Sequence, residues 1–308
     1  MSVRHVADLL AEEKDEGRHY YSFEFLPPRT EKGEEKLWDL HFPRFAKMEP
    51  LFVDITWGAG GQTSSTTLRI SKDFQEKYGV PVNMHLTCAN MHPGLLKETL
   101  DSCYKCGIRN ILALRGDPPN GTEWKPRDGE LTCALDLVKF IRANYGDFFC
   151  ISVAGYPEGH PSAINTVAGR ITEDGMKKEL DYLKAKVDAG ASLVITQIFY
   201  DADLFIEFVK KCRAHGITVP ILPGILPIST YRSLKRIVNL CKTYLPPEVA
   251  ARVEELKDDE EGLKKYGISQ AVKMVWAIQS ADINIKHFHL YVVNAPDSIL
   301  GVMNELGV

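Results

Sequence analysis

One carboxylate stands inside an otherwise apolar run, and its position suggests proton chemistry. Glu24 lies between Phe23 and Phe25 in the stretch YYSFEFLPPRT, which reads as a buried strand that ends at two prolines. Side chains alternate along a strand, so Glu24 would point into the mouth of a site. Aromatic neighbours and a bound ligand would dehydrate this carboxyl and raise its pKa from about 4.3 toward neutrality, as a general acid requires. The alternative is an ion pair with Arg29 or another base.

A second acidic residue follows another apolar run. In LALRGDPP, a strand ends at Arg115, Gly116 allows a ligand to approach, and two prolines stiffen the turn after Asp117. Asp117 could stabilise a cationic intermediate or accept hydrogen bonds from a heterocycle. The alternative is an Asx turn that closes the loop.

Three further motifs have structural explanations at least as good as chemical ones. The loop WGAGGQTSS, residues 57–65, could bind a phosphate, but it matches neither a Walker loop nor a dinucleotide fingerprint. His287 and His289 have a spacing that can ligate metal, but no set of carboxylate partners accompanies them, so we expect no metal. Cys103 and Cys106 have redox spacing inside a helical pattern, where ordinary thiols are expected.

The elements that position these residues alternate between strand and helix. Apolar or β-branched runs predict eight strands, at Tyr20–Leu26, Leu51–Trp57, Val82–Cys88, Asn110–Arg115, Phe149–Tyr156, Ser192–Phe199, Val219–Ile225 and Phe288–Asn294. Helices are expected to begin near Glu31, Ser65, Pro93, Gly129, Asp174, Ala202, Ser229 and Pro296. This alternation predicts an α/β protein with a closed (β/α)8 TIM barrel. An open doubly wound sheet is the alternative, but LPPRT follows the first strand where a glycine-rich phosphate turn would be expected.

We expect one domain over residues 1–308, with an N-terminal helix within 1–18 and a helical insertion over 246–281 before the last strand. The 37 basic and 41 acidic residues give a net charge of −4, which argues against a nucleic-acid partner. No apolar run approaches the length of a membrane span. Seven scattered cysteines and a charged, amphipathic N-terminus predict a reduced, cytoplasmic protein.

Polar side chains gather at one end of the predicted strands. The strand ends carry Glu24, Thr56 and Trp57, His85 and Thr87, Arg115 and Asp117, Tyr156 and His160, Gln197, Pro223, and Tyr291 with Asn294. Because barrel enzymes place their active sites at the carboxyl ends of the strands, these residues predict a ligand site.

Seven motifs together closely resemble one family. SFEFLPPRT, DITWGAGG, HLTCAN, LALRGDPP, VAGYPEGHP, AGASLVITQIFYD and PILPGILPI occur in the order of the catalytic domain of methylenetetrahydrofolate reductases, in wording closer to the eukaryotic branch. The resemblance implies a (β/α)8 flavoprotein with non-covalent FAD that reduces 5,10-methylenetetrahydrofolate to 5-methyltetrahydrofolate with NADH or NADPH. It also implies a homo-oligomer, a dimer or a tetramer. The additional C-terminal regulatory domain of eukaryotic members is expected to be absent from this chain.

The resemblance also implies residue roles. Glu24 matches the general acid, Asp117 matches the aspartate near both flavin and folate, and Gln197 and Tyr291 match folate-side residues. The positions that match FAD contacts are Thr56, Trp57, His85, Arg115, Gly116, Asp117, Cys133, Ala134, Tyr156, His160, Pro161, Ser162, Ala163, Glu179 and Lys186. Glu179 stands where some members have Asp, and the segment between His160 and Lys186 is longer than in many members. Ala295 stands where some members have a substrate-binding Arg.

Three other functions remain open at this point. The first is a non-catalytic, FAD-binding paralogue that serves as a partner subunit, which Ala295 would favour. The second is a metal-dependent barrel hydrolase that uses His85, His160, His287 and His289. The third is a different flavin oxidoreductase on the same barrel, such as a proline-oxidising enzyme.

Overall fold

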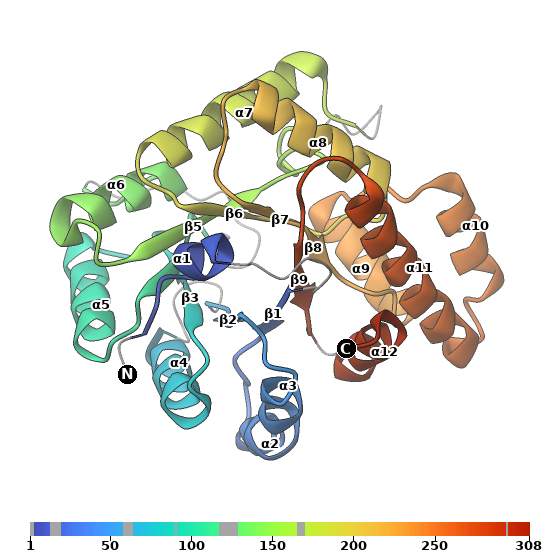
Figure 1. Ribbon diagram of the computed structural model, residues 1–308, viewed down its shortest axis with the longest axis horizontal. Helices are drawn as coiled ribbons and strands as arrows, with labels where there is room; N and C mark the ends of the chain where they lie inside the picture. Colours follow the sequence, from blue (N-terminus) through green and yellow to red (C-terminus); the bar gives the residue numbers. More distant parts are fainter. Residues whose placement is uncertain are drawn as a thin grey trace. The chain divides into compact units, whose positions relative to one another are not determined.

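The computed structural model describes residues 3–12, 20–57, 64–89, 91–116, 129–164, 170–293 and 295–308. Strands and helices alternate along the chain (Figure 1). The sheet of the described residues has nine strands in the hydrogen-bonding order β7-β6-β5-β4-β3-β2-β1-β9-β8. Their bounds are β1 Tyr20–Phe25, β2 Phe52–Ile55, β3 Val82–Thr87, β4 Asn110–Leu114, β5 Cys150–Gly155, β6 Leu193–Thr196, β7 Ile221–Leu222, β8 Gly224–Ile225 and β9 His287–Tyr291.

All eight expected strands are present, and one of them is interrupted. Pro223 separates β7 from β8, because proline has no N–H for a ladder hydrogen bond. The Pro223 carbonyl still accepts a hydrogen bond from the His289 backbone N–H at 3.0 Å. The two short strands are therefore halves of one strand, and the pairing order is that of a (β/α)8 barrel.

The chain divides into two compact units, which are described separately. The first comprises Met1–Ala154 and Ala185–Val194. In it, β1 to β5 pair in parallel with their sequence neighbours, and Glu24 is in register with Asp54. Its helical elements are α1 Val6–Ala11, α2 Glu31–Lys36, the π-helical turn η1 Leu37–His41, α3 Phe42–Ala46, α4 Ser64–Tyr78, α5 Pro93–Lys105 and α6 Ala134–Tyr145.

Aromatic packing on β1 explains why Glu24 stands between two phenylalanines. Phe23 and Phe25 both contact Phe45 of α3 edge to face, with ring centroids 4.8 Å and 5.3 Å apart. In Figure 1, α3 lies beside β1. Such aromatic pairs contribute about 0.5–1.5 kcal/mol each beyond the burial of their surface. Since side chains alternate, this packing turns Glu24 to the opposite face of the strand.

The second unit comprises Gly155–Lys184 and Ile195–Val308. Its helices are α8 Ala202–Ala214, α9 Tyr231–Cys241, α10 Pro247–Glu255, α11 Glu260–Ser280 and α12 Pro296–Leu306, and it holds most of α7 Glu173–Asp188. The expected insertion over 246–281 forms α10 and α11. Tyr200, Ile228, Leu234, Val249, Val253 and Leu263 anchor it in a hydrophobic cluster. Gln270 of α11 also donates a hydrogen bond to the Tyr200 carbonyl at 3.1 Å.

One helix begins later than the sequence pattern indicated. α6 begins at Ala134 instead of near Gly129, because Gly129 has a φ of +82° and belongs to a turn. Cys103 and Cys106 are both free thiols at the end of α5, and burial raises the pKa of Cys103 above its ordinary value. None of the helices in the described ranges is long and apolar enough to span a bilayer.

Candidate active site

A polar cluster lies on the face of β1 to β3 opposite the aromatic packing, in the first unit. Glu24, Asp54 and His85 come from three neighbouring strands, and all three side chains are buried. The Nε2 atom of His85 lies 3.0 Å from Asp54 Oδ2 and 3.6 Å from Glu24 Oε2. The register that pairs Glu24 with Asp54 accounts for this convergence. One imidazole thus faces two carboxylates away from bulk water.

The electrostatics of this cluster favour a proton on His85. Burial by itself lowers the pKa of the imidazole, but the charges of Glu24 and Asp54 and the hydrogen bond to Asp54 outweigh it. The net result is a pKa of His85 above its ordinary value. The ion pair left open for Glu24 is therefore present, with His85 as the base instead of Arg29.

The cluster contains residues that the sequence analysis missed. Asn83 Nδ2 donates to Asp54 Oδ2 at 3.1 Å, and Ser152 Oγ donates to Asn83 Oδ1 at 3.0 Å. Asp54, Asn83 and Ser152 are all buried. The available signal was the one that singled out Glu24, a polar residue inside an apolar strand, as in FVDI and VNMHLT. This network orients the Asp54 carboxylate toward His85.

The other strand-end residues of the first unit fall into two places. Thr56 and Trp57 follow β2 and are buried, and the Thr56 carbonyl accepts a hydrogen bond from Thr67. Arg115 and Gly116 follow β4, where the Arg115 carbonyl accepts a hydrogen bond from the Ala89 backbone N–H at 2.8 Å.

Gly116 lies in a tight place that requires glycine. Its φ is +89°, and a Cβ there would lie 2.8 Å from Thr87 Cβ. Nearby, the Cys88 thiol contacts the carbonyls of both Arg115 and Cys133. The structure therefore brings Arg115, Gly116 and Cys133 together around the end of β3.

Lys186 and Ala134 occupy buried positions in the same unit. Lys186 is 3% exposed, and its Nζ atom donates a hydrogen bond to the Ala154 carbonyl at 2.8 Å. Ala134 is the first residue of α6, directly after the N-cap Cys133. The ammonium group of Lys186 is thus held at the carboxyl end of β5.

In the second unit, residues 156–163 form a loop that organises itself. The rings of Tyr156 and His160 meet edge to face at 5.0 Å, and His160 Nδ1 lies 2.7 Å from Ser162 Oγ. The Ala163 backbone N–H donates to the His160 carbonyl, which closes the turn over Pro161. Glu179 stands apart from this loop in the sequence, half-buried on α7.

The two folate-side residues meet at Thr196 at the end of β6. The Tyr291 hydroxyl donates to the Thr196 carbonyl at 2.8 Å. Gln197 is the next residue, and its Oε1 atom accepts a hydrogen bond from the Ile198 backbone N–H at 2.9 Å. Gly224 completes the contact, since a Cβ there would lie 2.3 Å from the Thr196 carbonyl oxygen. The hydroxyl of Tyr291 therefore has a structural partner.

Three expectations lie outside the described residues. They concern Asp117, most of the glycine-rich loop at 58–63, and Asn294. Ala295 is described and is the N-cap residue of α12.

Comparison with known proteins shows the family. The sequence profile of methylenetetrahydrofolate reductase matches residues 9–307. Methylenetetrahydrofolate reductase (NADH) 1 of Zea mays is 45% identical over 304 residues, which cover 98% of this chain and 51% of the maize protein. The 5,10-methylenetetrahydrofolate reductase of Pectobacterium carotovorum is 36% identical, with 95% of this chain and 92% of that protein covered. The chain thus spans about half the length of the maize relative and nearly all of the bacterial one.

Among solved structures, a protein of Clostridium thermocellum has a TM-score of 0.65 at 14% identity, with 97% of each chain covered. It is described as an uncharacterized protein that binds two copies of 5-methyl-5,6,7,8-tetrahydrofolic acid. At this identity the likeness supports the fold alone. The profile match and the bacterial relative decide the assignment: this chain belongs to the methylenetetrahydrofolate reductase family.

Proposed function

We propose that the protein reduces 5,10-methylenetetrahydrofolate to 5-methyltetrahydrofolate with NADH or NADPH through FAD. Family membership over nearly the whole chain supports the reaction. The name of the maize relative supports NADH as the first donor to assay. The folate bound by the Clostridium thermocellum protein supports a reduced pterin as ligand of this fold. The single observation that carries the proposal is the buried proton-bearing group formed by Glu24, His85 and Asp54.

Two features of the first unit fit a flavin. The indole Nε1 of Trp57 is buried and has no hydrogen-bond partner among the described residues. An indole N–H only donates, so the site suits a ligand rich in acceptors, as the isoalloxazine ring is. The left-handed turn at Gly116 keeps the end of β4 free of a side chain.

The residues that would hold FAD are those carried over from the family, in both units. In the first unit they are Thr56, Trp57, His85, Arg115, Gly116, Cys133, Ala134 and Lys186, with Asp117. In the second they are Tyr156, His160, Pro161, Ser162, Ala163 and Glu179. When bound, FAD accepts hydride from the nicotinamide and passes it to the folate in a second half-reaction, a ping-pong scheme.

Glu24 supplies the proton that opens the five-membered ring of the substrate. The methylene bridge accepts hydride only after one C–N bond breaks, and protonation of that nitrogen makes it a leaving group. The proton on His85 lies near both Glu24 and Asp54, so it can replace the one that Glu24 gives up. Buried Asn83 and Ser152 hold Asp54 in place for this role.

The remaining residues bind the substrate and stabilise its charge. Breaking the C–N bond leaves a cationic iminium, which the carboxylate of Asp117 stabilises electrostatically. The Gln197 side chain orients the amide-like edge of the pterin without adding charge. Tyr291 contributes its ring, because its hydroxyl already donates to Thr196.

An anaerobic absorption experiment tests the proposal in two steps. NADH, and then NADPH, is added to the purified protein supplied with FAD, and the flavin absorption is recorded. We expect bleaching, followed by recovery when 5,10-methylenetetrahydrofolate is added. Bleaching without recovery would contradict the folate reaction, and failure to bind flavin would contradict the entire proposal.

A further inference from the structure

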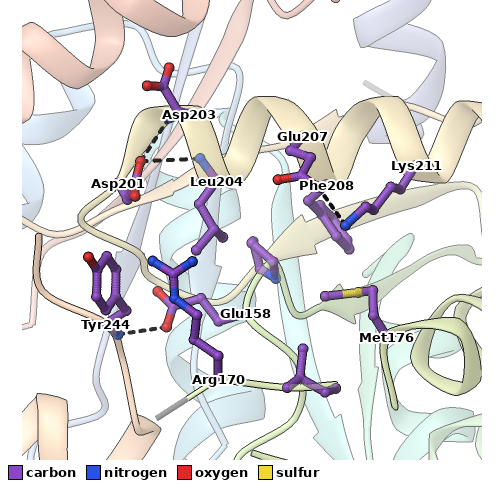
Figure 2. A pocket seen from close by; sticks show the side chains of 12 residues that line it. Glu158, Arg170, Met176, Asp201, Asp203, Leu204, Glu207, Phe208, Lys211 and Tyr244 are labelled. Atoms are coloured by element: carbon purple, nitrogen blue, oxygen red, sulfur yellow. Dashed lines mark hydrogen bonds and ion pairs between the residues drawn. The ribbon is translucent and has the colours of Figure 1, made fainter. Parts of the chain in front are cut away.

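A cavity of about 330 Å³ lies within the second unit. This volume falls in the range of small-molecule sites, roughly 300–1,000 Å³. Figure 2 shows its lining, which comes from the loop after β5, from α7, from α8 and from Tyr244. The lining residues are Pro157, Glu158, Arg170, Ile171, Met176, Asp201, Asp203, Leu204, Glu207, Phe208, Lys211 and Tyr244. None of them is among the residues assigned above to FAD or folate.

Glu158 points an incompletely bonded carboxyl into this cavity. Its Oε2 atom accepts a hydrogen bond from the Tyr244 backbone N–H at 2.6 Å. Its Oε1 atom is buried and has no hydrogen-bond partner in the part of the chain that the structure describes. A buried polar atom left without a partner costs about 1–3 kcal/mol. A donor from a ligand would remove that cost.

The surroundings of Glu158 carry an excess of negative charge. The charged residues around the cavity are the acids Glu158, Asp201, Asp203 and Glu207 and the bases Arg170 and Lys211. Lys211 is already paired with Glu207 at 2.6 Å, at the other end of the lining (Figure 2). Arg170 lies over the ring of Tyr244, 4.4 Å from its centroid.

This environment shifts the pKa of Glu158. Burial raises it to about 7, and the charge of Asp201 adds to the rise. The hydrogen bond from Tyr244 and the charge of Arg170 act in the opposite direction but do not outweigh burial. A cation placed against Glu158 would favour its ionised form.

The remaining wall of the cavity is apolar. Leu204 and Phe208 lie on one face of α8, and Met176 lies across from them on α7. Pro157 and Ile171 complete this wall. A flexible thioether beside an aromatic ring adapts well to a flat apolar body.

We propose that this cavity binds a small organic cation with an apolar or aromatic body, whose amidinium, guanidinium or ammonium group donates to Glu158 Oε1. Asp201 supplies the second negative charge, and its Oδ1 atom is fixed by the backbone N–H groups of Asp203 and Leu204. The apolar body lies against Leu204, Phe208 and Met176. The site is independent of the flavin and folate chemistry proposed above.

Benzamidine is a suitable probe, because it joins an amidinium to a flat ring. Its binding to the full chain is measured by titration calorimetry, with neutral benzamide as the control of similar shape. We expect benzamidine to bind at about pH 8 at least tenfold more tightly than benzamide. We also expect its affinity to fall about tenfold toward pH 6, as Glu158 takes up a proton. Equal binding of the two probes, or an affinity independent of pH, would overturn the proposal.

Three variants locate the site. Glu158→Gln keeps an acceptor for the Tyr244 N–H, so it is expected to fold and to lose at least tenfold in benzamidine affinity. Glu207→Gln is the matched control, because Glu207 is exposed and paired with Lys211, and its affinity should stay within about twofold. Arg170→Gln removes a competing cation and should tighten binding. Unchanged affinity in Glu158→Gln, or weaker binding in Arg170→Gln, would refute the assignment. Should Glu158→Gln fail to fold, the pH dependence and the benzamide comparison decide the matter in the wild-type protein.

Discussion

Asp54→Asn offers a sharp test of the proton-bearing group. The substitution keeps the size of the side chain and removes one of the two negative charges beside His85, including the one at 3.0 Å. A hydrogen bond between charged groups contributes about 1.5–3 kcal/mol. Since 1.36 kcal/mol corresponds to a factor of ten, protonated His85 should become about 10- to 100-fold rarer at a fixed alkaline pH.

The two half-reactions should respond differently to Asp54→Asn. We expect flavin reduction by NADH to be nearly unchanged. Flavin reoxidation by 5,10-methylenetetrahydrofolate should slow by about 10- to 100-fold, and the alkaline limb of its pH profile should move to lower pH. Anaerobic stopped-flow absorbance across a pH series measures both steps. The matched control is Asp73→Asn on α4, where the carboxylate is partly exposed and 3.8 Å from Arg69.

The same variant has a consequence for folding stability. Because the pKa of His85 is raised in the folded protein, its protonation stabilises the fold below the ordinary value of about 6.5. That stability is lost as the pH rises through the raised pKa. Asp54→Asn should therefore lose more free energy of unfolding at about pH 6 than at about pH 9. An unmoved alkaline limb, or equal slowing of both half-reactions, would refute the role given to the cluster.

Three further predictions concern single residues. Glu24→Gln should retain FAD and its reduction by NADH but lose folate reduction by about 10²–10⁴, as measured by the same two half-reactions; unchanged folate turnover would exclude the general-acid role. Glu158 binds its proton more tightly in the folded protein, with a pKa of about 7, so it destabilises the fold as the pH rises from about 4.5 to 7. Glu158→Gln should therefore gain about 2–3 kcal/mol relative to wild type between about pH 5 and pH 8 in urea denaturation, and an equal difference at both pH values would contradict this. Gly267→Ala would place a Cβ 1.8 Å from the Ile228 carbonyl oxygen, so it should cost at least about 1–3 kcal/mol in the same assay, and no loss would show that α11 can shift.

Much of the fold could be predicted because it depends on local patterns. Apolar runs of strand length and helical periodicity located all eight strands, and Glu31, Pro93, Ala202 and Pro296 begin helices as expected. The late start of α6 and the break at Pro223 were missed. The first depends on a left-handed turn at Gly129, and the second on which N–H groups the neighbouring strand needs.

The candidate site divides in the same way. Glu24 stood out because a carboxylate between two phenylalanines is unusual, and the motifs at the strand ends were specific enough to indicate the family. Asp54, Asn83 and Ser152 did not stand out, although they carry the same signal. The binding partner of Glu24 was left open, since a base such as Arg29 lies nearby in the sequence whereas His85 lies two strands away.

The sequence by itself determined the alternation of strands and helices, the face on which Glu24 lies and the family. These depend on side chains a few residues apart, whose relation is set by the period of the strand or helix. Only the tertiary structure decided which groups face Glu24 and which way the pKa of His85 moves. Both follow from the register of β1, β2 and β3, which brings residues about 30 positions apart to within 3.6 Å in a setting where charges interact strongly. The cavity beside Glu158 likewise exists only because α7, α8 and Tyr244 meet there in the folded chain.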